Sequence, residues 1–480
     1  MAAFTDNQLK NIQGLGIAGY RKDYQHLLFV NAGDQGAGRR LLAWLEPRVA
    51  TAWEVGRFNQ LFSEIRGRSN SEPLSATWFG VAVSAAGFNV LGVSLAGLPP
   101  REGSAAFAAG MARRTTQIGD TRPADEPASW LEPFRPGGGV HLLILIASDE
   151  EQDLNDAVTE TIDHVYASGS NLVFEERGGT LPGALRGHEH FGFRDGSSQP
   201  AIADYDDPPV NAEPPPVPPG EFVLGYPDAT GTVAAVGPLW ADGSFGVFRR
   251  LTQDVAGFRH QAQAGVAGSD PAVIGDQLAA KMIGRWPDGA SVELYPDADP
   301  GPDHESNAFQ YHVSDDDGQH CPRWAHIRKA NPRDETTPDP AGDAPGLHRM
   351  IRRGIPFGPP LPLDATGDDG VPRGLHFLCV VSDLDRQFEF VQRRWLNDPN
   401  FPGGQATQSQ TPYAPSPQGQ PDGPDPVIGE HDDGAECALH QASGVHQFPI
   451  VTEVVHVTAG EYFFLPSLSA VAALASGAIS

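Results

Sequence analysis

The chain has 480 residues, with 33 basic and 61 acidic side chains and a formal net charge of −28. This acidic excess argues against nucleic acid and anionic membrane surfaces as partners, because phosphate binding needs clustered Lys and Arg. The 3 cysteines stand far apart and form no Cys-x-x-Cys pair, which excludes a disulfide framework and a cysteine-based zinc site.

Targeting signals are not visible in the sequence. No basic segment followed by an apolar stretch stands at the start, and no run of about 18 apolar residues occurs. The apolar stretch after Arg39 and Arg40 is too short for a twin-arginine signal. We therefore expect a cytoplasmic protein without a membrane span.

Short apolar runs predict strands along the whole chain. In chain order they are residues 26–30, 79–83, 140–147, 222–226, 243–248, 375–381 and 451–456, with a further short run at 463–466. Short strands separated by helices and long loops favour an α+β fold over a doubly wound sheet.

Two of these strands share one plan with the helix that follows. A Ser-Asp pair comes after each strand, and Ser148 and Ser382 are predicted to cap the helices. Both helices carry an apolar stripe, formed by Leu154, Val158, Ile162 and Val165 in the first and by Leu384, Phe388, Val391 and Trp395 in the second. The two units lie about half the chain apart, which suggests a duplicated α+β domain.

A proline-rich stretch predicts the domain boundary. Seven of the twelve residues 208–219 are proline, a composition typical of an extended spacer. We therefore expect an N-terminal domain at 1–207, a linker at 208–219 and a C-terminal domain at 220–480. A second irregular tract, 396–434, is too long for a simple connection and predicts a functional loop or an insertion.

The first segment that could carry chemistry is 187–196, which places Asp195 in a Gly-x-x-Asp-Gly pattern. One interpretation is a tight turn in which Asp195 caps its own backbone. The other is a carboxylate held rigidly between glycines, close to a flat cofactor. His188 and His190 are more typical of structural histidines than of metal ligands, because no third ligand lies nearby.

The second segment, 321–333, places His326 among basic residues in an acidic chain. A neutral imidazole is a good axial ligand for haem iron, and neighbouring arginines pair well with haem propionates. Cys321 is a rival thiolate ligand. No Cys-x-x-Cys-His motif occurs, so any haem is expected to be bound non-covalently.

The third segment, 348–358, carries the adjacent pair Arg352 and Arg353 in an apolar stretch bounded by Gly and Pro. Two guanidinium groups are costly to bury there unless they meet an anion or a polarised ligand. A solvated charge pair is the simpler interpretation. The motifs of the common serine hydrolases, zinc metalloproteases and P-loop proteins are absent from the sequence.

Taken together, these segments resemble the dye-decolorising peroxidases, a family of haem enzymes, and in particular its larger subgroups. Each segment alone is unspecific, and the signal lies in their order along nearly the whole chain. The segments are residues 11–14, 181–183, 190–200, 220–227, 321–333, 348–358, 387–390 and 463–467.

The resemblance implies two duplicated ferredoxin-like α+β domains, in which antiparallel sheets carry helices. One non-covalent haem b per chain would be held mainly by the C-terminal domain. His326 would be the proximal iron ligand, with Arg328 and Arg333 among the cofactor-binding residues. Leu375 and Phe377 would line the distal side, and we expect His376 between them to point the other way along the strand.

The resemblance also implies a haem peroxidase that reduces hydrogen peroxide to water and oxidises dyes, phenolics or Mn(II) in one-electron steps. Asp195 would move protons and Arg352 would stabilise charge on the breaking O–O bond. A carboxylate base suits an acid pH optimum with anionic dyes, since it is still partly ionised near pH 4. The alternatives are a haem-binding or haem-handling protein with incidental peroxidase activity, and a structural member that binds no haem.

Several supporting roles remain open between candidates. Glu389 or Asp425 would accept the second N–H of His326 and strengthen it as a ligand. Surface aromatic residues would relay electrons to large substrates, with Trp395, Tyr311 and Tyr413 as candidates. Acidic loops at 297–303 and 315–317 are candidate sites for Mn²⁺ or Ca²⁺, although solvated loop charge is the simpler interpretation.

Overall fold

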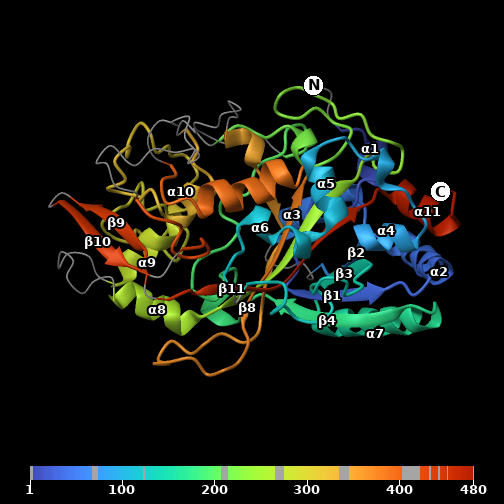
Figure 1. Cartoon of the computed structure of the whole chain (residues 1–480), viewed down its shortest axis with the longest axis horizontal. Coiled ribbons are helices and arrows are strands. Elements are labelled where there is room, and N and C mark those ends of the chain that lie inside the picture. The colour runs from blue at the N-terminus through green and yellow to red at the C-terminus, as the bar shows by residue number, and fades with distance from the viewer. Residues whose placement is uncertain are drawn as a thin grey trace.

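The computed structural model describes residues 4–66, 74–122, 125–206, 214–264, 275–334, 345–402, 422–431, 434–441, 444–450 and 452–478. One nine-stranded sheet runs through the molecule and takes strands from both halves of the chain (Figure 1). Neighbouring strands follow the order β4-β1-β3-β2-β11-β5-β8-β6, with β7 paired to β8. All of these pairs are antiparallel.

The strands of this sheet are β1 (Tyr24–Asn31), β2 (Thr77–Ser84), β3 (Leu142–Ser148), β4 (Asn171–Gly179), β5 (Ser244–Gln253), β6 (Ile351–Arg352), β7 (Ile355–Phe357), β8 (Gly374–Val381) and β11 (Val455–Leu465). A separate hairpin is formed by β9 (Glu436–Gln441) and β10 (Gly444–Pro449). The helices of the first half are α1 (Asp6–Asn11), α2 (Gln35–Leu45), α3 (Ala52–Arg66), α4 (Ala85–Val90), α5 (Glu102–Ala109), α6 (Thr115–Ile118) and α7 (Glu151–Ala167). Those of the second half are α8 (Val255–Ala264), α9 (Gly275–Ile283), α10 (His326–Ala330) and α11 (Leu468–Ser476).

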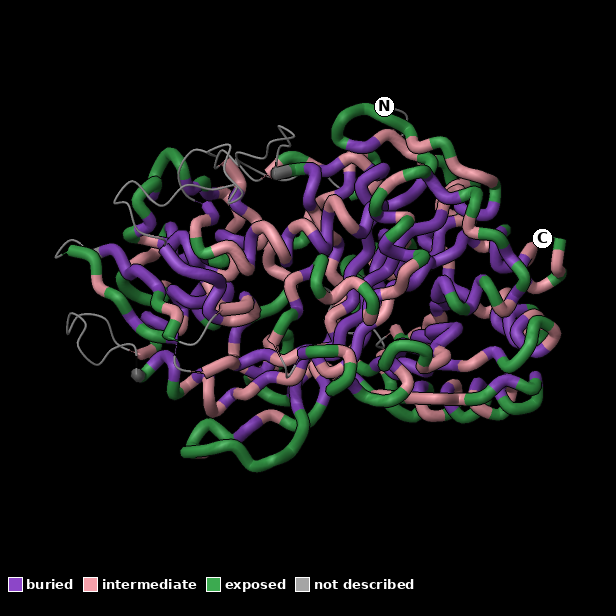
Figure 2. Tube along the Cα trace, in the orientation of Figure 1, coloured by how far each residue is buried: buried purple, intermediate pink, exposed green. Residues whose placement is uncertain are grey.

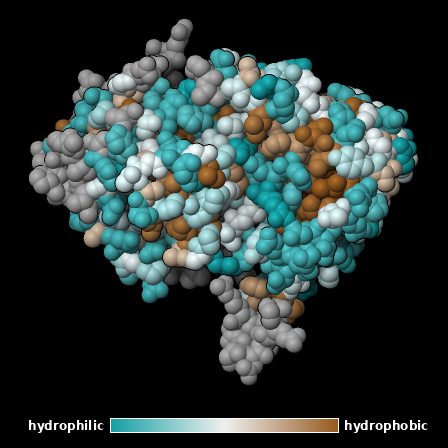
Figure 3. Space-filling view, turned by 90° about the horizontal axis from the view of Figure 1, so that it is seen from below, coloured by the Kyte–Doolittle hydropathy of each residue, from teal (hydrophilic) through white to brown (hydrophobic). Residues whose placement is uncertain are grey.

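Buried residues lie in the interior on both sides of the molecule, and exposed residues lie mainly along its outline (Figure 2). Strands β1, β3, β5, β8 and β11 contribute many of the buried residues. Every residue of β3 is buried, since β1 and β2 pair with its two edges and α7 packs against it. The face of the molecule seen from below is largely hydrophilic, with apolar side chains in separate clusters (Figure 3). The antiparallel sheet with its helices confirms the α+β class and agrees with two ferredoxin-like halves.

The two halves of the sheet meet where β2 pairs with β11, through Phe463 opposite Ser84 and Phe464 opposite Val83. The side chain of Gln13 reinforces this joint. Its Nε2 donates to the carbonyl oxygens of Val81 (2.8 Å) and Pro466 (2.7 Å), and its Oε1 accepts the N–H of Val81 (3.1 Å). Segment 11–14 therefore connects the end of the chain to the first half of the sheet.

The proline-rich stretch belongs partly to the packed structure. Residues 207–213 lie outside the described residues. In the described part, Val217 forms a β-bridge with Ile202, and Pro219 is buried at the start of a 3₁₀ turn. The boundaries at 207 and 220 therefore remain a proposal.

Two of the local strand predictions are wrong, and a long edge strand was missed. Residues 222–226 form a tight turn instead of a strand, although Phe222, Val223 and Leu224 are buried as the apolar run predicts. Of the described part of the predicted run 451–456, only residues 455 and 456 lie in a strand, and they share the single strand β11 with residues 463–465 of the next run. The edge strand β4 was not predicted, because its residues are mostly half-exposed and alternate only weakly.

Both predicted serine caps are also wrong. Helix α7 has Glu150 in the cap position, while the hydroxyl of Ser148 accepts the N–H of Glu150 at 3.3 Å and lies 2.9 Å from the hydroxyl of Thr77. After β8 the chain winds as a π-helix at Asp385–Glu389 and Val391–Leu396. At its start the side chain of Gln387, not that of Ser382, accepts the backbone N–H groups of residues 382 and 383. The predicted apolar stripe of this segment is buried throughout.

A buried carboxyl in β11 predicts a pH-dependent loss of stability. Burial raises the pKa of Glu461 from 4.5 to about 7, and its Oε1 accepts the N–H groups of Met111 and Tyr462. The unfolded chain releases this proton near pH 4.5, so the carboxyl lowers stability as the pH rises from about 4.5 to 7. Glu461→Gln keeps an acceptor oxygen without a charge. Its free energy of unfolding relative to the wild type is expected to rise by up to about 3 kcal/mol between pH 4.5 and pH 8.

Chemical denaturation of both proteins at the two pH values measures this difference. The exposed Glu126, changed to Gln, is the control and is expected to show no pH-dependent difference. An equal effect of Glu461→Gln at both pH values would contradict the assignment of a buried, protonated carboxyl.

Candidate active site

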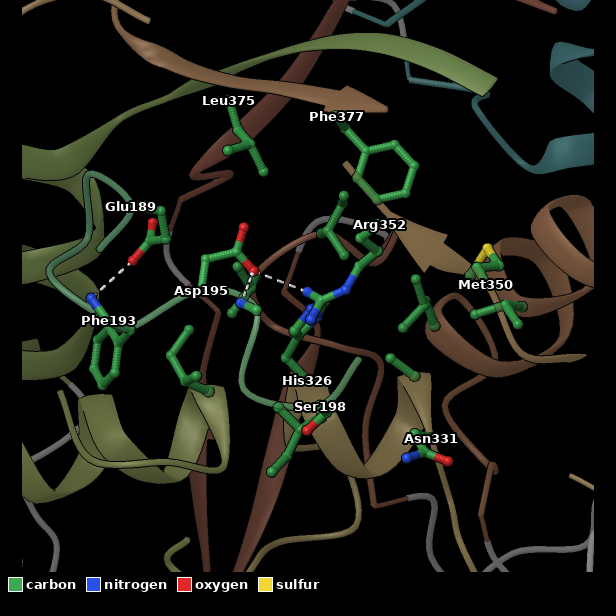
Figure 4. Close-up of a pocket in the computed structure, with 18 of the residues that line it drawn as sticks. Glu189, Phe193, Asp195, Ser198, His326, Asn331, Met350, Arg352, Leu375 and Phe377 are labelled. Atoms are coloured by element: carbon green, nitrogen blue, oxygen red, sulfur yellow. Dashed lines mark hydrogen bonds and ion pairs between the residues drawn. The ribbon is translucent and has the colours of Figure 1, made fainter. Parts of the chain in front are cut away.

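One pocket lies where β8, the 189–198 segment, α10, the 348–352 segment and the π-helix meet (Figure 4). Six of the predicted site residues line it: Asp195, His326, Arg333, Arg352, Leu375 and Phe377. They come from positions far apart in the sequence and from both predicted domains. The fold therefore brings these six residues into one pocket, whereas the sequence showed only their order along the chain.

His326 is the first residue of α10 and faces the pocket. Its Nδ1 is 2.7 Å from Oδ2 of Asp425, a carboxylate that is fully buried. The Oδ1 of Asp425 accepts the N–H groups of Val427 (2.8 Å) and Ile428 (3.2 Å), which fixes the carboxylate in place. Asp425 raises the pKa of His326 above 6.5 against the opposing effect of burial. None of the described residues pairs with Nε2, which is left for a ligand.

The choice between the two candidate carboxylates is therefore settled in favour of Asp425. Glu389 points elsewhere, since its carboxylate pairs with Arg114 and accepts the hydroxyl of Tyr462 at 2.8 Å. The sequence did not decide this, because Asp425 lies about a hundred residues from His326 in a tract without periodicity.

Asp195 and Arg352 form an ion pair on the pocket wall. Oδ1 of Asp195 accepts Nη1 of Arg352 at 3.0 Å and the backbone N–H of Gly196 at 2.6 Å. No described residue donates to Oδ2, which points towards Leu375 and Phe377 in Figure 4. Gly196 has a φ of +89°, a conformation that favours glycine at the turn behind the carboxylate. Asp195 thus caps the turn, as the first interpretation of the glycine motif predicts, and it also lines the pocket with a carboxylate oxygen free of described donors.

Strand β8 supplies the apolar side of the pocket. Leu375 and Phe377 line it, while His376 between them is buried on the opposite face, as the alternation of a strand predicts. There the imidazole of His376 lies 3.1 Å from the Glu176 carboxylate and stacks on Phe357. Burial lowers the pKa of His376, so the ring supports the strand as a neutral group.

Arginines dominate the polar lining. Besides Arg352, the wall contains Arg194, Arg249, Arg285, Arg333 and Arg349, against the two carboxylates Glu189 and Asp195. Burial lowers the pKa of both Arg285 and Arg349 to about 10. Arg333 donates to the carbonyls of Asn307 and Phe309 at 2.8 and 3.2 Å. A surplus of guanidinium groups in so acidic a chain is the feature expected of a pocket for an anionic ligand.

Arg328 is not among the residues that line the pocket, so the geometry does not support the prediction that it binds the cofactor. Its guanidinium is fully buried and donates to Oδ2 of Asp315 (3.0 Å) and to the carbonyl of Cys321 (2.6 Å). Each helical residue turns the chain by about 100°, which places a residue at i+2 on the side opposite His326. Arg328 therefore anchors the start of α10 through Asp315 and Cys321.

Glu189 is a pocket residue that the sequence analysis did not single out. Its carboxylate accepts the N–H groups of Phe191 and Phe193, both at 2.9 Å, and the side-chain amide of Gln253 at 2.5 Å. Burial raises the pKa of Glu189 to about 7. Its position between two histidines in the 187–196 segment is the signal that was available for it.

The other metal-site candidates do not converge. His190 bonds to the carbonyl of Phe357 at 2.8 Å, and Cys321 is fully buried outside the pocket. In the acidic loop 315–317, Asp315 accepts the N–H groups of His320 and Cys321. Among the described residues, no group of three or more His, Cys, Asp or Glu side chains is placed to hold a metal ion.

Two of the proposed relay residues are not on the surface. Trp395 and Tyr311 are 1% and 0% exposed, so their description as surface aromatics is wrong. Tyr413 lies outside the described residues.

Within the described part of the chain, no helix has the length and apolar character needed to cross a membrane.

A second hollow reaches the Asp195–Arg352 pair from another side. Its walls include residues 15–22 and the 351–356 segment, and it has Asp195, Gly196 and Arg352 in common with the main pocket. The ion pair therefore stands where the two hollows adjoin.

Comparisons with known proteins agree with this geometry. The family model for the DyP dimeric alpha+beta barrel domain matches residues 11–179. A dye-decolorizing peroxidase of Mycena epipterygia is 30% identical, with 98% of this chain and 87% of the relative covered. Peroxidase 2 of Mycetinis scorodonius is 31% identical, with 98% and 88% covered.

Solved structures show the same likeness. An ancestral D-type dye decolorizing peroxidase matches with a TM-score of 0.83 and 29% identity, covering 98% of this chain and 99% of the other. A decolorizing peroxidase from Auricularia auricula-judae matches with a TM-score of 0.79 and 27% identity, covering 97% and 99%. The fold and these relatives define a peroxidase enzyme. The chain belongs to the dye-decolorizing peroxidase family, whose members depend on haem.

Proposed function

We propose that this peroxidase uses one non-covalently bound haem b to reduce hydrogen peroxide to water while oxidising dyes and other small reductants in one-electron steps. The observation that carries the proposal is the pairing, across one pocket, of His326 backed by Asp425 with the Asp195–Arg352 ion pair. A ligand for iron and a proton-transferring pair that share one pocket are what peroxide reduction requires.

The residues present fit a haem. His326 offers Nε2 as an axial ligand, Leu375 and Phe377 offer an apolar side, and Arg333 and Arg349 offer partners for two propionates. The Nε atoms of Arg285 and Arg333 are buried, and no described residue accepts a hydrogen bond from them. Such unpaired donors are expected in a pocket where a bound anion accepts their hydrogen bonds. The bound haem would supply the iron at which peroxide is reduced and from which oxidising equivalents pass to the reductant.

Asp195 would move the proton. Since Oδ1 is engaged by Arg352 and Gly196, Oδ2 is the atom able to accept a proton from incoming peroxide and to return it to the departing oxygen as water. Arg352 would orient the carboxylate and stabilise the negative charge that develops during O–O cleavage. The second hollow offers small peroxide a route to this pair that does not cross the apolar side of the pocket.

The experiment that tests the proposal measures peroxide-dependent decolorisation of an anthraquinone dye by the haem-loaded protein. We expect turnover that needs both haem and peroxide. Mn(II) is tested as an alternative donor in the same assay, and efficient oxidation of Mn(II) would extend the substrate range. A haem-loaded protein that leaves the dye unchanged would contradict the proposal and favour the haem-handling alternative.

Asp425→Asn tests whether the carboxylate of Asp425 strengthens His326 as an iron ligand. The amide removes the negative charge behind the imidazole, so the bound iron is expected to become easier to reduce. The rate of reaction with peroxide is expected to fall by about 10- to 100-fold while haem stays bound. A redox titration and stopped-flow mixing with peroxide measure the two effects.

Asp422→Asn is the matched control, because Asp422 is also buried and also pairs with a histidine, His440, at 3.0 Å. Unchanged potential and rate in Asp422→Asn are expected. Equal changes in both variants would show that the effect of Asp425 is a general loss of structure in this loop.

A further inference from the structure

Met350 places an oxidisable thioether on the wall of the active-site pocket. Its side chain lines the pocket on the side opposite Glu189 in Figure 4 and is partly exposed. Met111 and Met282 are 0% exposed and lie outside the pocket. These two residues therefore serve as internal references for the reactivity of Met350.

The sulfur of Met350 has a defined neighbour. The thiol of Cys379, fully buried in β8, donates a hydrogen bond to Sδ of Met350, and the two sulfur atoms are 3.8 Å apart. Burial raises the pKa of Cys379 well above its usual range, so the group is a thiol, which is a poor nucleophile. One lone pair of the thioether accepts this S–H, and the other remains available for oxidation. Met350 is therefore the reactive sulfur of the pair.

We propose that Met350 is a modification site, which peroxide oxidises to methionine sulfoxide within the loaded pocket when no reductant is present. The proposal rests on the proposed haem site. The bound haem would supply the centre at which the O–O bond of hydrogen peroxide breaks, and without a reductant the two oxidising equivalents would pass to Met350. One oxygen atom is added to the sulfur as the S=O bond, and the other leaves as water. The sulfur gives up two electrons, and the peroxide accepts them, so atoms and electrons balance.

Oxidation would change the wall of the pocket. Met350 packs against the apolar cluster of Val391, Trp395, Leu396 and Phe401. A sulfoxide places a polar, strongly accepting oxygen in this contact, two residues from Arg352 in the same segment. Excess peroxide would therefore change the packing beside the Asp195–Arg352 pair by oxidising Met350.

The test follows oxygen uptake by each methionine. Haem-loaded protein receives stepwise equivalents of hydrogen peroxide without a reductant, is digested, and is analysed by mass spectrometry. The Met350 peptide is expected to gain one oxygen atom at least about tenfold faster than the Met111 and Met282 peptides. An excess of oxidisable dye is expected to suppress this gain, and protein without haem is expected to lose the preference for Met350.

Two outcomes separate this proposal from the proposed function. Protein that loads haem and decolorises dye but leaves Met350 unoxidised would overturn the modification site alone. Equal oxidation of Met350 with and without haem would also overturn it, since exposure alone would then explain the reaction. Met350→Leu, compared with its own untreated activity, is expected to tolerate more equivalents of peroxide than the wild type. Equal sensitivity of the variant and the wild type would count against the proposal.

Discussion

Asp195→Asn is expected to slow the reaction of the haem-loaded protein with hydrogen peroxide by about 10²- to 10⁴-fold, the usual contribution of a positioned acid–base group. Asparagine keeps the size of the side chain and one oxygen, which still accepts from Arg352 and Gly196. It replaces Oδ2 by an amide nitrogen, and this atom cannot accept a proton. The predicted loss therefore comes from proton transfer and not from the geometry of the pocket.

Stopped-flow mixing with peroxide measures the rate of this first step, and the haem spectrum of the resting protein shows whether the pocket is intact. Asp369→Asn is the matched control, since Asp369 is also bonded to an arginine, Arg373 at 2.7 Å, but lies outside the pocket. A variant of Asp195 that reacts as fast as the wild type would remove Asp195 from the mechanism.

His326→Ala is expected to abolish stable binding of haem. Asp425 holds the imidazole of His326 at the pocket wall, and alanine has no side-chain nitrogen that could bind iron. The apolar side of the pocket and the arginines would remain, so some loosely held haem is expected to wash out on gel filtration. The ratio of Soret to protein absorbance after this step measures the loss.

His440→Ala is the comparison for this variant, because His440 is equally paired with a buried aspartate but does not line the pocket. Its haem content is expected to match that of the wild type. Full haem occupancy in His326→Ala would refute the assignment of the iron ligand.

The sequence was most informative where function depends on residue type at a fixed place in a motif. Asp195, His326 and Arg352 each stand in a short segment of unusual composition, and all three line the pocket. The alternation of β8 correctly separated Leu375 and Phe377 from His376, because a strand allows only two directions. The succession of short strands, helices and long loops along the chain also predicted the α+β fold class correctly.

The sequence was least informative where function depends on contacts between distant segments. Asp425 lies in an irregular tract, and only the folded chain places it behind His326. Arg328 looked like its basic neighbours, but its direction depends on the turn of α10 and on the position of Asp315. Residues 222–226 show the same limit, since an apolar run predicts burial without deciding between a strand and a packed turn.

We propose that one pocket joins a histidine ligand for haem to a proton-transferring Asp195–Arg352 pair. The most direct test is the absorbance spectrum of the purified, haem-loaded protein before and after one equivalent of hydrogen peroxide. We expect a Soret band that shifts within the mixing time and returns to the resting spectrum when a reducing dye is added. A Soret band that peroxide leaves unchanged would contradict this proposal.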